Sequence, residues 1–367
     1  MLYSLPLLRA EGWNVKVWCL RSDIPKDEAE HVLFPAAEWL GPFQLFYFTL
    51  IVNLYGFWRW GCGRPRPAQI IHATSGTFFG ADLVSVQFIN SLWLRFQMKA
   101  GLRSAKDLIK LAFVLVGILF EKMSWLSPSL LRVLAVSTSI ADEMRRLAPR
   151  VPLVETLPNS YDETRFNPAV RDQYREPTRA RLGLGSNEVV FAFLSTGHYE
   201  RKGFWLAVDA LALVRSKYKR TDLNFLVIGG AEAALAQLRS QLQARHPGFS
   251  DWIIFAGQQP RVEEYLAAAD AFLYPSYFEA FCLAEIEAAV MGIPLLITRH
   301  YGSEMILKDG INGLSLEWDH ARIAERICHF LLLSAKAFQL DAGNALARAQ
   351  YAETLLAIYN ASLGGAM

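Results

Sequence analysis

Two glutamates in the second half of the chain are spaced so that both can serve one binding site. Glu279 lies in a short loop, and Glu287 follows inside a predicted helix at residues 283–291. A predicted strand at residues 271–274 precedes them, and ligands of α/β proteins bind beyond the carboxyl ends of such strands. The two carboxylates can therefore point into one crevice. A lone glutamate in either place would be an ordinary solvated residue.

The beginning of the same predicted helix can face an anion. The first N–H groups of a helix have no partner within it, and the helix dipole favours negative charge at that end. Phe281, Cys282 and Leu283 would supply these N–H groups. We expect an anionic part of a ligand here.

A pair of basic residues follows another predicted strand, at residues 189–195. The chain passes through Gly197, and Arg201 and Lys202 then precede a predicted helix at residues 204–217. Two cations beside a helix start can neutralise a bound anion such as a phosphate group. Arginine can hold two phosphate oxygens while lysine acts as a point charge. The alternative is a basic pair on the surface beside a helix.

Together these segments resemble the donor site of the family 4 retaining glycosyltransferases. The glutamate-x7-glutamate signature of that family is similar to the pattern Pro275-Ser276-x-x-Glu279-x-Phe281-x-Leu283-x-x-x-Glu287-Ala288-x-x-x-Gly292-x-Pro294. The family's arginine-lysine-glycine element is similar to Arg201-Lys202-Gly203. The resemblance implies an α/β protein of the GT-B fold, in which two doubly wound Rossmann-like domains face a central cleft.

The resemblance also implies catalytic roles for three residues. Arg201 and Lys202 would stabilise the departing diphosphate. Glu279 would position the sugar and stabilise its oxocarbenium-like transition state. Whether Glu279 acts as a nucleophile stays open.

Further residues would bind the nucleotide part of the donor. Glu287 would hold the ribose, and the backbone at Gly197 and at the helix start would face the diphosphate. Gly257 and Gln258, which follow a predicted strand, would lie beside the base, although turn chemistry explains them equally well.

The implied reaction is a hexosyltransferase-like transfer of a sugar from a nucleoside-diphosphate-sugar to a hydroxyl acceptor, with retention at the anomeric carbon. Two alternatives share this fold. One is a sugar epimerase or phosphorylase of the GT-B type, and the other is a catalytically silent subunit that binds a nucleotide-sugar.

The sequence gives no pattern that is typical of a metal or cofactor site. No two aspartates are separated by one residue, no His-x-x-x-His pair occurs, and the four cysteines form no C-x-x-C pair. We therefore expect no cofactor and a metal-independent mechanism. The cysteine usage favours a reducing, cytoplasmic setting.

Regular alternation of strand-like and helix-like segments predicts a parallel sheet in each half of the chain. We expect an acceptor-side domain at residues 1–170, a nucleotide-sugar-binding domain at 171–340 and a final helix in 341–367 that packs back towards the first domain. Residues 167–187 lack an apolar period and predict a linker.

The first half departs from the family pattern in two places. The chain begins with a helix-like piece before the predicted strand at residues 14–20, so that the opening strand of the domain and its glycine loop are missing. In addition, Gln87 stands where many relatives have a histidine near the acceptor, and glutamine cannot act as a base.

Composition limits the partners. The net charge of +2 and the absence of a known nucleic-acid motif exclude a nucleic-acid partner from the prediction. Five basic residues recur at helical spacing, which predicts one basic face for an anionic membrane or, alternatively, a solvated helix face: Arg95, Lys99, Arg103, Lys106 and Lys110. With membrane contact, the protein would be peripheral on the inner face of the membrane, and the acceptor would be lipid-linked or an envelope polysaccharide.

Overall fold

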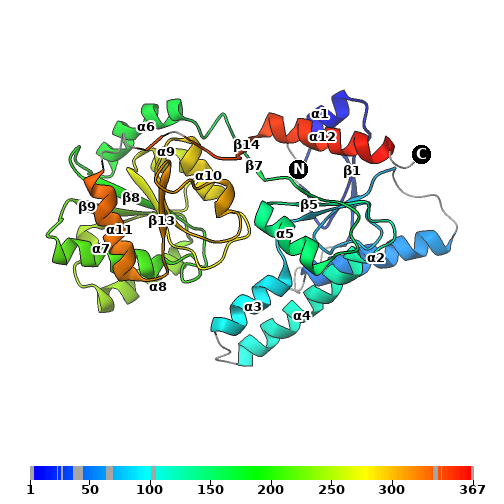
Figure 1. Cartoon of the computed structure of the whole chain (residues 1–367), viewed down its shortest axis with the longest axis horizontal. Coiled ribbons are helices and arrows are strands. Elements are labelled where there is room, and N and C mark those ends of the chain that lie inside the picture. Colours follow the sequence, from blue (N-terminus) through cyan, green and yellow to red (C-terminus); the bar gives the residue numbers. More distant parts are fainter. Residues whose placement is uncertain are drawn as a thin grey trace. The chain divides into compact units, whose positions relative to one another are not determined.

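The computed structural model describes residues 4–22, 24–25, 28–35, 44–62, 69–100, 105–333, 338–339 and 341–364. It divides into two compact units. Unit 1 comprises residues 1–159 and 346–367, and unit 2 comprises residues 160–345 (Figure 1). The chain thus passes between the units after Asn159 and after Ala345, whereas the predicted boundaries lie near residues 170 and 340.

Unit 2 is built on a six-stranded parallel sheet with the strand order β10-β9-β8-β11-β12-β13. The strands are β8 (Val189–Leu194), β9 (Leu223–Ile228), β10 (Ile253–Gly257), β11 (Ala271–Tyr274), β12 (Leu295–Thr298) and β13 (Gly313–Leu316). Every residue of β9, β11 and β12 is buried, as expected for a parallel sheet that is covered on both faces. The predicted Rossmann-like architecture is confirmed in this unit.

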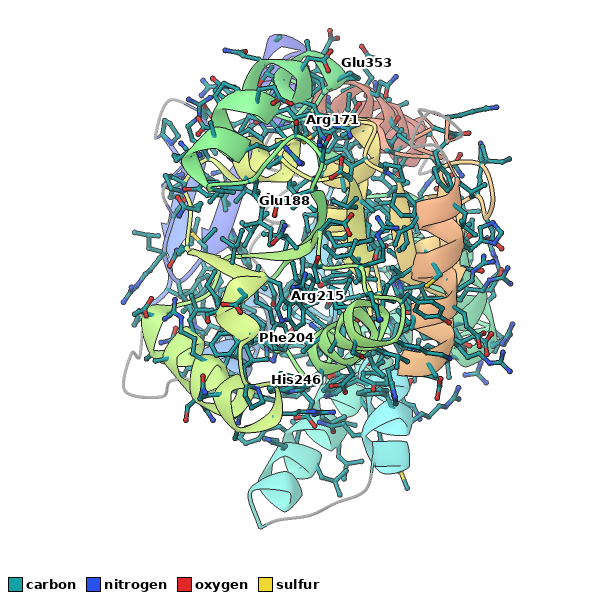
Figure 2. The ribbon with its side chains drawn as sticks, turned by 90° about the vertical axis from the view of Figure 1, so that its left-hand side faces the viewer. Arg171, Glu188, Phe204, Arg215, His246 and Glu353 are labelled. Carbon is teal, nitrogen blue, oxygen red and sulfur yellow. The ribbon has the colours of Figure 1, made fainter. Side chains whose placement is uncertain are left out.

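Helices follow the strands of this sheet along the chain, and the last of them comes after the final strand. They are α7 (Phe204–Lys217), α8 (Glu232–Arg245), α9 (Val262–Ala267), α10 (Leu283–Val290) and α11 (His320–Leu332). Phe204 and Arg215, both labelled in Figure 2, lie on α7, and the Phe204 side chain is fully buried. Asp319 caps α11 by accepting a hydrogen bond from the Arg322 N–H at 2.9 Å.

The segment that we predicted as a linker forms a helix, α6 (Pro168–Arg181). Its inner side carries arginines beside a few partly buried apolar side chains, among them Val170 and Tyr174. Arg179 is 2% exposed, and its Nη1 donates to the carbonyl of Ala268 at 3.0 Å and to Asp270 at 3.3 Å. Arg171, labelled in Figure 2, donates to the carbonyl of Gly292. The prediction was wrong because charged hydrogen bonds, which a search for an apolar period does not detect, help to fix this helix.

Unit 1 contains a four-stranded parallel sheet with the order β3-β4-β5-β6 and a separate parallel pair, β1-β2. The strands are β1 (Lys16–Cys19), β2 (Glu30–Leu33), β3 (His72–Thr74), β4 (Leu83–Val86), β5 (Arg132–Ala135) and β6 (Val154–Thr156). A helix, α1 (Leu5–Ala10), precedes β1 and lies beside the last helix, α12 (Arg348–Gly364), in Figure 1. Leu8, Leu83 and Leu355 share one core.

Unit 1 also contains further helices. They are α2 (Gln44–Gly61), α3 (Asn90–Ala100), α4 (Ala105–Trp125) and α5 (Thr138–Leu147). Two short strands complete the chain, β7 (Ser160–Tyr161) at the start of unit 2 and β14 (Leu346–Ala347) in unit 1.

The predicted single basic face does not exist as one helix. Arg95 and Lys99 belong to α3, whereas Lys106 and Lys110 belong to α4, which packs against α3 (Figure 1). Arg103 lies outside the described residues, as do the side chains of Lys99 and Lys106. The Nη1 of Arg95 lies 3.9 Å from Glu143 of α5. A helical period that runs through Gly101 in the sequence is divided here between two helices.

Candidate functional site

The strand order of unit 2 fixes where a ligand site is expected. The chain runs from β8 outwards to β9 and β10 and then returns to the other side of β8 as β11. The connections that follow β8 and β11 therefore leave neighbouring strands in opposite directions. Such a switch point at the carboxyl ends of the strands is where ligands bind in doubly wound sheets.

Main-chain and hydroxyl contacts join the two loops at this point. The Tyr277 N–H donates to the carbonyl of Arg201 at 2.9 Å, and the Ser276 hydroxyl lies 3.3 Å from the same carbonyl. The Arg201 guanidinium donates to the carbonyl of Phe278. The loop after β8 and the loop after β11 thus form one continuous surface.

A glycine makes this close approach possible. Gly203 has a φ of 76°, which is the left-handed region, and it caps the start of α7. A Cβ at this position would lie 2.0 Å from the carbonyl oxygen of Pro275. Any side chain here would therefore push the two loops apart. The sequence had shown Gly203 as part of a motif without showing this packing reason.

Glu279 and Arg201 form an ion pair within this surface. The Arg201 Nη1 lies 3.0 Å from the Glu279 Oε1, and their side chains are 22% and 12% exposed. The same carboxylate oxygen lies 3.4 Å from the Tyr274 hydroxyl and 3.3 Å from the Ser276 hydroxyl. These contacts fix the carboxylate in a polar, partly dehydrated position.

Lys202 lies over the same part of the site. Its Nζ is 5.3 Å from the centre of the Tyr274 ring, which is a cation–π distance. Tyr274 is itself fully buried, and burial raises the pKa of its hydroxyl well above the ordinary value. The structure therefore brings together three of the predicted residues, Glu279, Arg201 and Lys202.

The beginning of α10 follows directly. Cys282 occupies the N-cap position in an extended conformation, Phe281 is half-buried, and Leu283 is 42% exposed. Burial raises the pKa of the Cys282 thiol well above its ordinary value, so that this group stays a neutral thiol at neutral pH. The dipole and the first N–H groups of α10 are the features of this helix start that suit an anion.

A buried pair that we did not predict lies close enough to Glu279 and Lys202 for their charges to act on it. The Glu285 Oε1 lies 2.7 Å from the His300 Nε2, and both side chains are at most 1% exposed. Burial raises the pKa of Glu285. Burial alone would lower the pKa of His300, but the Glu285 carboxylate raises it to about 9. The pair therefore keeps a proton at neutral pH. The sequence signal that could have found this pair is Glu285 itself, because a glutamate on the inward face of α10 needs a partner.

Glu287 lies among a different set of charges. Its neighbours are Arg165 and Glu263, which form an ion pair of 2.5 Å with each other. Burial raises the pKa of Glu287 to about 7, with Arg165 opposing this shift and Glu263 adding to it. Glu279 and Glu287 thus have separate electrostatic environments, although both lie on the segment after β11.

The predicted glycine positions lie at two further strand ends. Gly197 follows β8, where its N–H donates to the Ser195 hydroxyl at 3.1 Å, and a Cβ added to it would have no atom within 4 Å. Gly257 ends β10 with a φ of 69° and accepts a bond from the Gly229 N–H at 2.7 Å. The side chain of Gln258 is exposed. The protein's own packing leaves the space beside Gly197 open to a ligand.

Neither a cluster of metal-ligating side chains nor a membrane-spanning helix occurs within the described ranges. Among these residues no three His, Cys, Asp or Glu side chains lie close enough to hold a metal ion. Within the same ranges, no helix has both the length and the apolar character needed to cross a bilayer.

Part of the second unit is similar to a known protein family. Residues 188–332 match the family model of the group 1 glycosyl transferases, which confirms the predicted resemblance for this segment. A D-inositol 3-phosphate glycosyltransferase of Arthrobacter sp. (strain FB24) is 31% identical over 168 residues, which cover 45% of this chain and 38% of that protein. The mannosylfructose-phosphate synthase of Agrobacterium fabrum is 30% identical over 171 residues, 44% of this chain and 36% of the relative. The chain thus matches less than two fifths of the length of these two relatives.

Solved structures extend the likeness to both units. WaaG, a glycosyltransferase involved in lipopolysaccharide biosynthesis, has a TM-score of 0.68 at 17% identity and covers 96% of this chain and 88% of its own. HepE of Anabaena in complex with UDP and glucose has a TM-score of 0.66 at 14% identity, with 98% and 94% covered. The predicted GT-B fold is therefore confirmed.

Proposed function

We propose that this chain transfers a sugar from a nucleoside-diphosphate-sugar to a hydroxyl acceptor, with retention at the anomeric carbon and without a metal ion. The observation that carries the proposal is the Arg201–Glu279 ion pair at the switch point of a sheet whose residues match the group 1 glycosyl transferases. The GT-B fold supports it.

Arg201 and Lys202 would stabilise the diphosphate as it leaves. The contacts of Arg201 with Glu279 and Phe278 use Nη1, and a guanidinium carries further donors on Nη2 and Nε that suit phosphate oxygens. Lys202 adds a second positive charge beside the start of α10. The helix dipole acts in the same direction. This arrangement supplies charge stabilisation where a metal ion would otherwise be needed.

Glu279 would face the sugar. Its carboxylate is held by Arg201, Tyr274 and Ser276, so that its negative charge has a fixed position. A fixed carboxylate stabilises the positive charge that develops on the sugar ring in an oxocarbenium-like transition state.

Glu287 would accept hydrogen bonds from the ribose hydroxyls, while Gly257 and Gln258 would lie beside the base. Because HepE was solved with UDP and glucose, we take uridine diphosphate and its sugars as the first donors to test. We further propose a cytoplasmic protein, peripheral on the inner membrane face, that acts on a lipid-linked or envelope polysaccharide acceptor. WaaG, a fold neighbour, is involved in lipopolysaccharide biosynthesis, which supports this choice.

The test has two steps. Thermal-shift measurements with nucleoside diphosphates and their sugars identify the donor, and transfer of a radiolabelled sugar to extracted lipid and glycan fractions then measures activity with and without EDTA. Retention is read from the anomeric configuration of the product by NMR. Donor epimerisation or cleavage without transfer would favour an epimerase or phosphorylase, and tight nucleotide binding without any product would favour a silent subunit. Loss of activity in EDTA would contradict the metal-free mechanism.

A further inference from the structure

A pocket of about 410 Å³ opens in unit 1. It lies between α2, the end of α4 and the loop that connects β3 to β4. Its walls include Phe57, Phe78, Phe79, Met123 and Leu126. The volume falls in the range of small-molecule sites, about 300–1,000 Å³, and such sites are lined mainly by apolar side chains.

The polar groups in the pocket wall are bonded within the protein. Asn53 is 5% exposed, and its amide donates to the carbonyls of Thr49 at 2.7 Å and Thr77 at 2.9 Å. Its Oδ1 accepts from the Phe79 N–H at 2.9 Å. At the opposite wall, the hydroxyls of Ser127 and Ser129 lie 2.8 Å apart. Since burying a polar ligand atom without a partner is costly, these walls favour an apolar ligand.

Exposed apolar side chains continue from the pocket along both helices. Leu50 and Leu54 of α2 are 55% and 57% exposed. On α4, Leu115 and Leu119 are 50% and 55% exposed, and one face of the helix leads from them to the pocket wall. The two helices contact each other through aromatic side chains, since the rings of Phe46 in α2 and Phe113 in α4 have centres 5.1 Å apart. Exposed apolar side chains gathered beside a pocket are typical of an interaction site.

An exposed lysine lies beside the pocket. Lys122 is exposed in the last turn of α4, next to Met123 of the pocket wall. The sequence of α2, residues 44–61, contains no aspartate or glutamate. An anionic headgroup would therefore meet an attractive surface, while its hydrocarbon chain would meet an apolar one.

We propose that this pocket binds the hydrocarbon chain of a lipid-linked acceptor, which makes an anionic lipid the acceptor class of this protein. The assignment of the lipid as an acceptor rests on the proposed function, whereas chain binding by the pocket can be measured independently of it. The proposal does not depend on the predicted basic helix face.

Chain-length dependence of binding tests the pocket. We compare dodecyl phosphate with butyl phosphate by isothermal titration on the full chain, with dodecyl phosphate below its micelle-forming concentration. Both probes carry the same headgroup. Each buried methylene contributes about a four-fold gain in affinity. If roughly three to four of the eight additional methylenes are buried in the pocket, dodecyl phosphate binds on the order of 100-fold more tightly. Equal affinity for the two probes overturns the proposal.

Two variants place the binding at the pocket. Leu126→Glu and Met123→Glu introduce a charge into the wall, and because these side chains are 62% and 43% exposed the fold should tolerate them. We expect the chain-length preference to fall to within a few-fold of unity. Leu332→Glu in α11 of unit 2, where the leucine is 89% exposed, is the matched control and should keep the preference. If both pocket variants keep the preference for dodecyl phosphate, the hydrocarbon chain does not bind in this pocket.

Sedimentation and nucleotide binding complete the test. A dimer that Leu126→Glu dissociates would mean that a second copy covers this surface, and the lipid proposal would then be wrong. Thermal shift measures uridine diphosphate binding by the pocket variants. Their binding should equal that of the unmodified chain. If no nucleoside diphosphate or its sugar binds while the chain-length preference persists, the proposed function fails and the pocket stands as a lipid site.

Discussion

Arg201 and Glu279 meet across two loops that leave neighbouring strands of one sheet, with Nη1 of the arginine 3.0 Å from Oε1 of the glutamate. The same guanidinium donates to the carbonyl of Phe278. The cation proposed to bind a phosphate and the carboxylate proposed to face a sugar are therefore held by the same two loops. This geometry ties the proposed leaving-group stabilisation to the proposed sugar contact.

Removing either partner of this ion pair should abolish most of the sugar transfer. We expect Arg201→Ala and Glu279→Gln each to lower kcat by roughly 10²–10³-fold, because each removes a charge that is fixed in the site. Transfer of a labelled sugar under saturating donor measures the effect. Glu200→Gln, which changes an exposed glutamate next in sequence to Arg201, should keep full turnover. Full activity in Glu279→Gln would remove the central residue of the proposed mechanism.

Gly203→Ala should destabilise unit 2 and weaken donor binding. The added Cβ would lie 2.0 Å from the Pro275 carbonyl oxygen, and φ is 76°. We expect a loss of roughly 3 kcal/mol or more in the free energy of unfolding. Gly183→Ala is the matched control, since φ is 70° there and no atom lies within 4 Å of the added Cβ. It should cost about 1–2 kcal/mol. Equal losses in urea unfolding would show that the close approach to Pro275 is unimportant.

Glu287 should make donor affinity depend on pH. Burial raises its pKa to about 7, so the carboxylate that would accept bonds from ribose forms as the pH rises through that value. We expect the affinity for uridine diphosphate glucose to be up to about ten-fold higher at pH 8 than at pH 6. At pH 8 the Glu287→Gln variant should bind the donor more weakly than the unmodified chain does. Its affinity should not change with pH. Glu325→Gln on α11 is a control that should follow the original profile. Tighter binding at pH 6 would contradict the ribose assignment.

Glu121 in α4 should make unit 1 less stable as the pH rises. Its carboxylate accepts bonds from the Asn90 N–H at 3.0 and 3.1 Å and is 3% exposed. Burial raises its pKa from 4.5 to about 7, with the Asn90 bonds opposing this shift. The folded state therefore holds a proton that the unfolded state releases between these values, so stability falls as pH rises from about 4.5 through 7, by up to about 3 kcal/mol.

Urea unfolding at pH 5 and pH 8 measures this effect. Glu121→Gln should remove the corresponding part of the pH dependence, because glutamine stays neutral at both values. Glu11→Gln, a change of an exposed glutamate in the same unit, should leave it intact. If both variants show the original slope, another group is responsible.

Much of unit 2 was predictable from the sequence because its strands are continuous apolar runs. The predicted strands at residues 189–195 and 271–274 are β8 (Val189–Leu194) and β11 (Ala271–Tyr274) in the structure, and both are largely buried. Glu279, Arg201 and Lys202 were predicted from their positions after such strands. The helix α6 was missed because Arg171 and Arg179 fix it through hydrogen bonds, and the division of the basic period between α3 and α4 was missed because spacing alone does not show a helix end.

The sequence by itself determined the alternation of strands and helices, the segment that matches the family and the residue types available for donor binding. The tertiary structure alone decided which of these residues meet. The return of β11 to the side of β8 places Glu279 against Arg201, and Glu287 falls among Arg165 and Glu263. It also placed Glu285 against His300 and opened the apolar pocket of unit 1. Local patterns fix local structure because they act over one or two turns, whereas contacts between distant segments depend on how the whole sheet is ordered and packed.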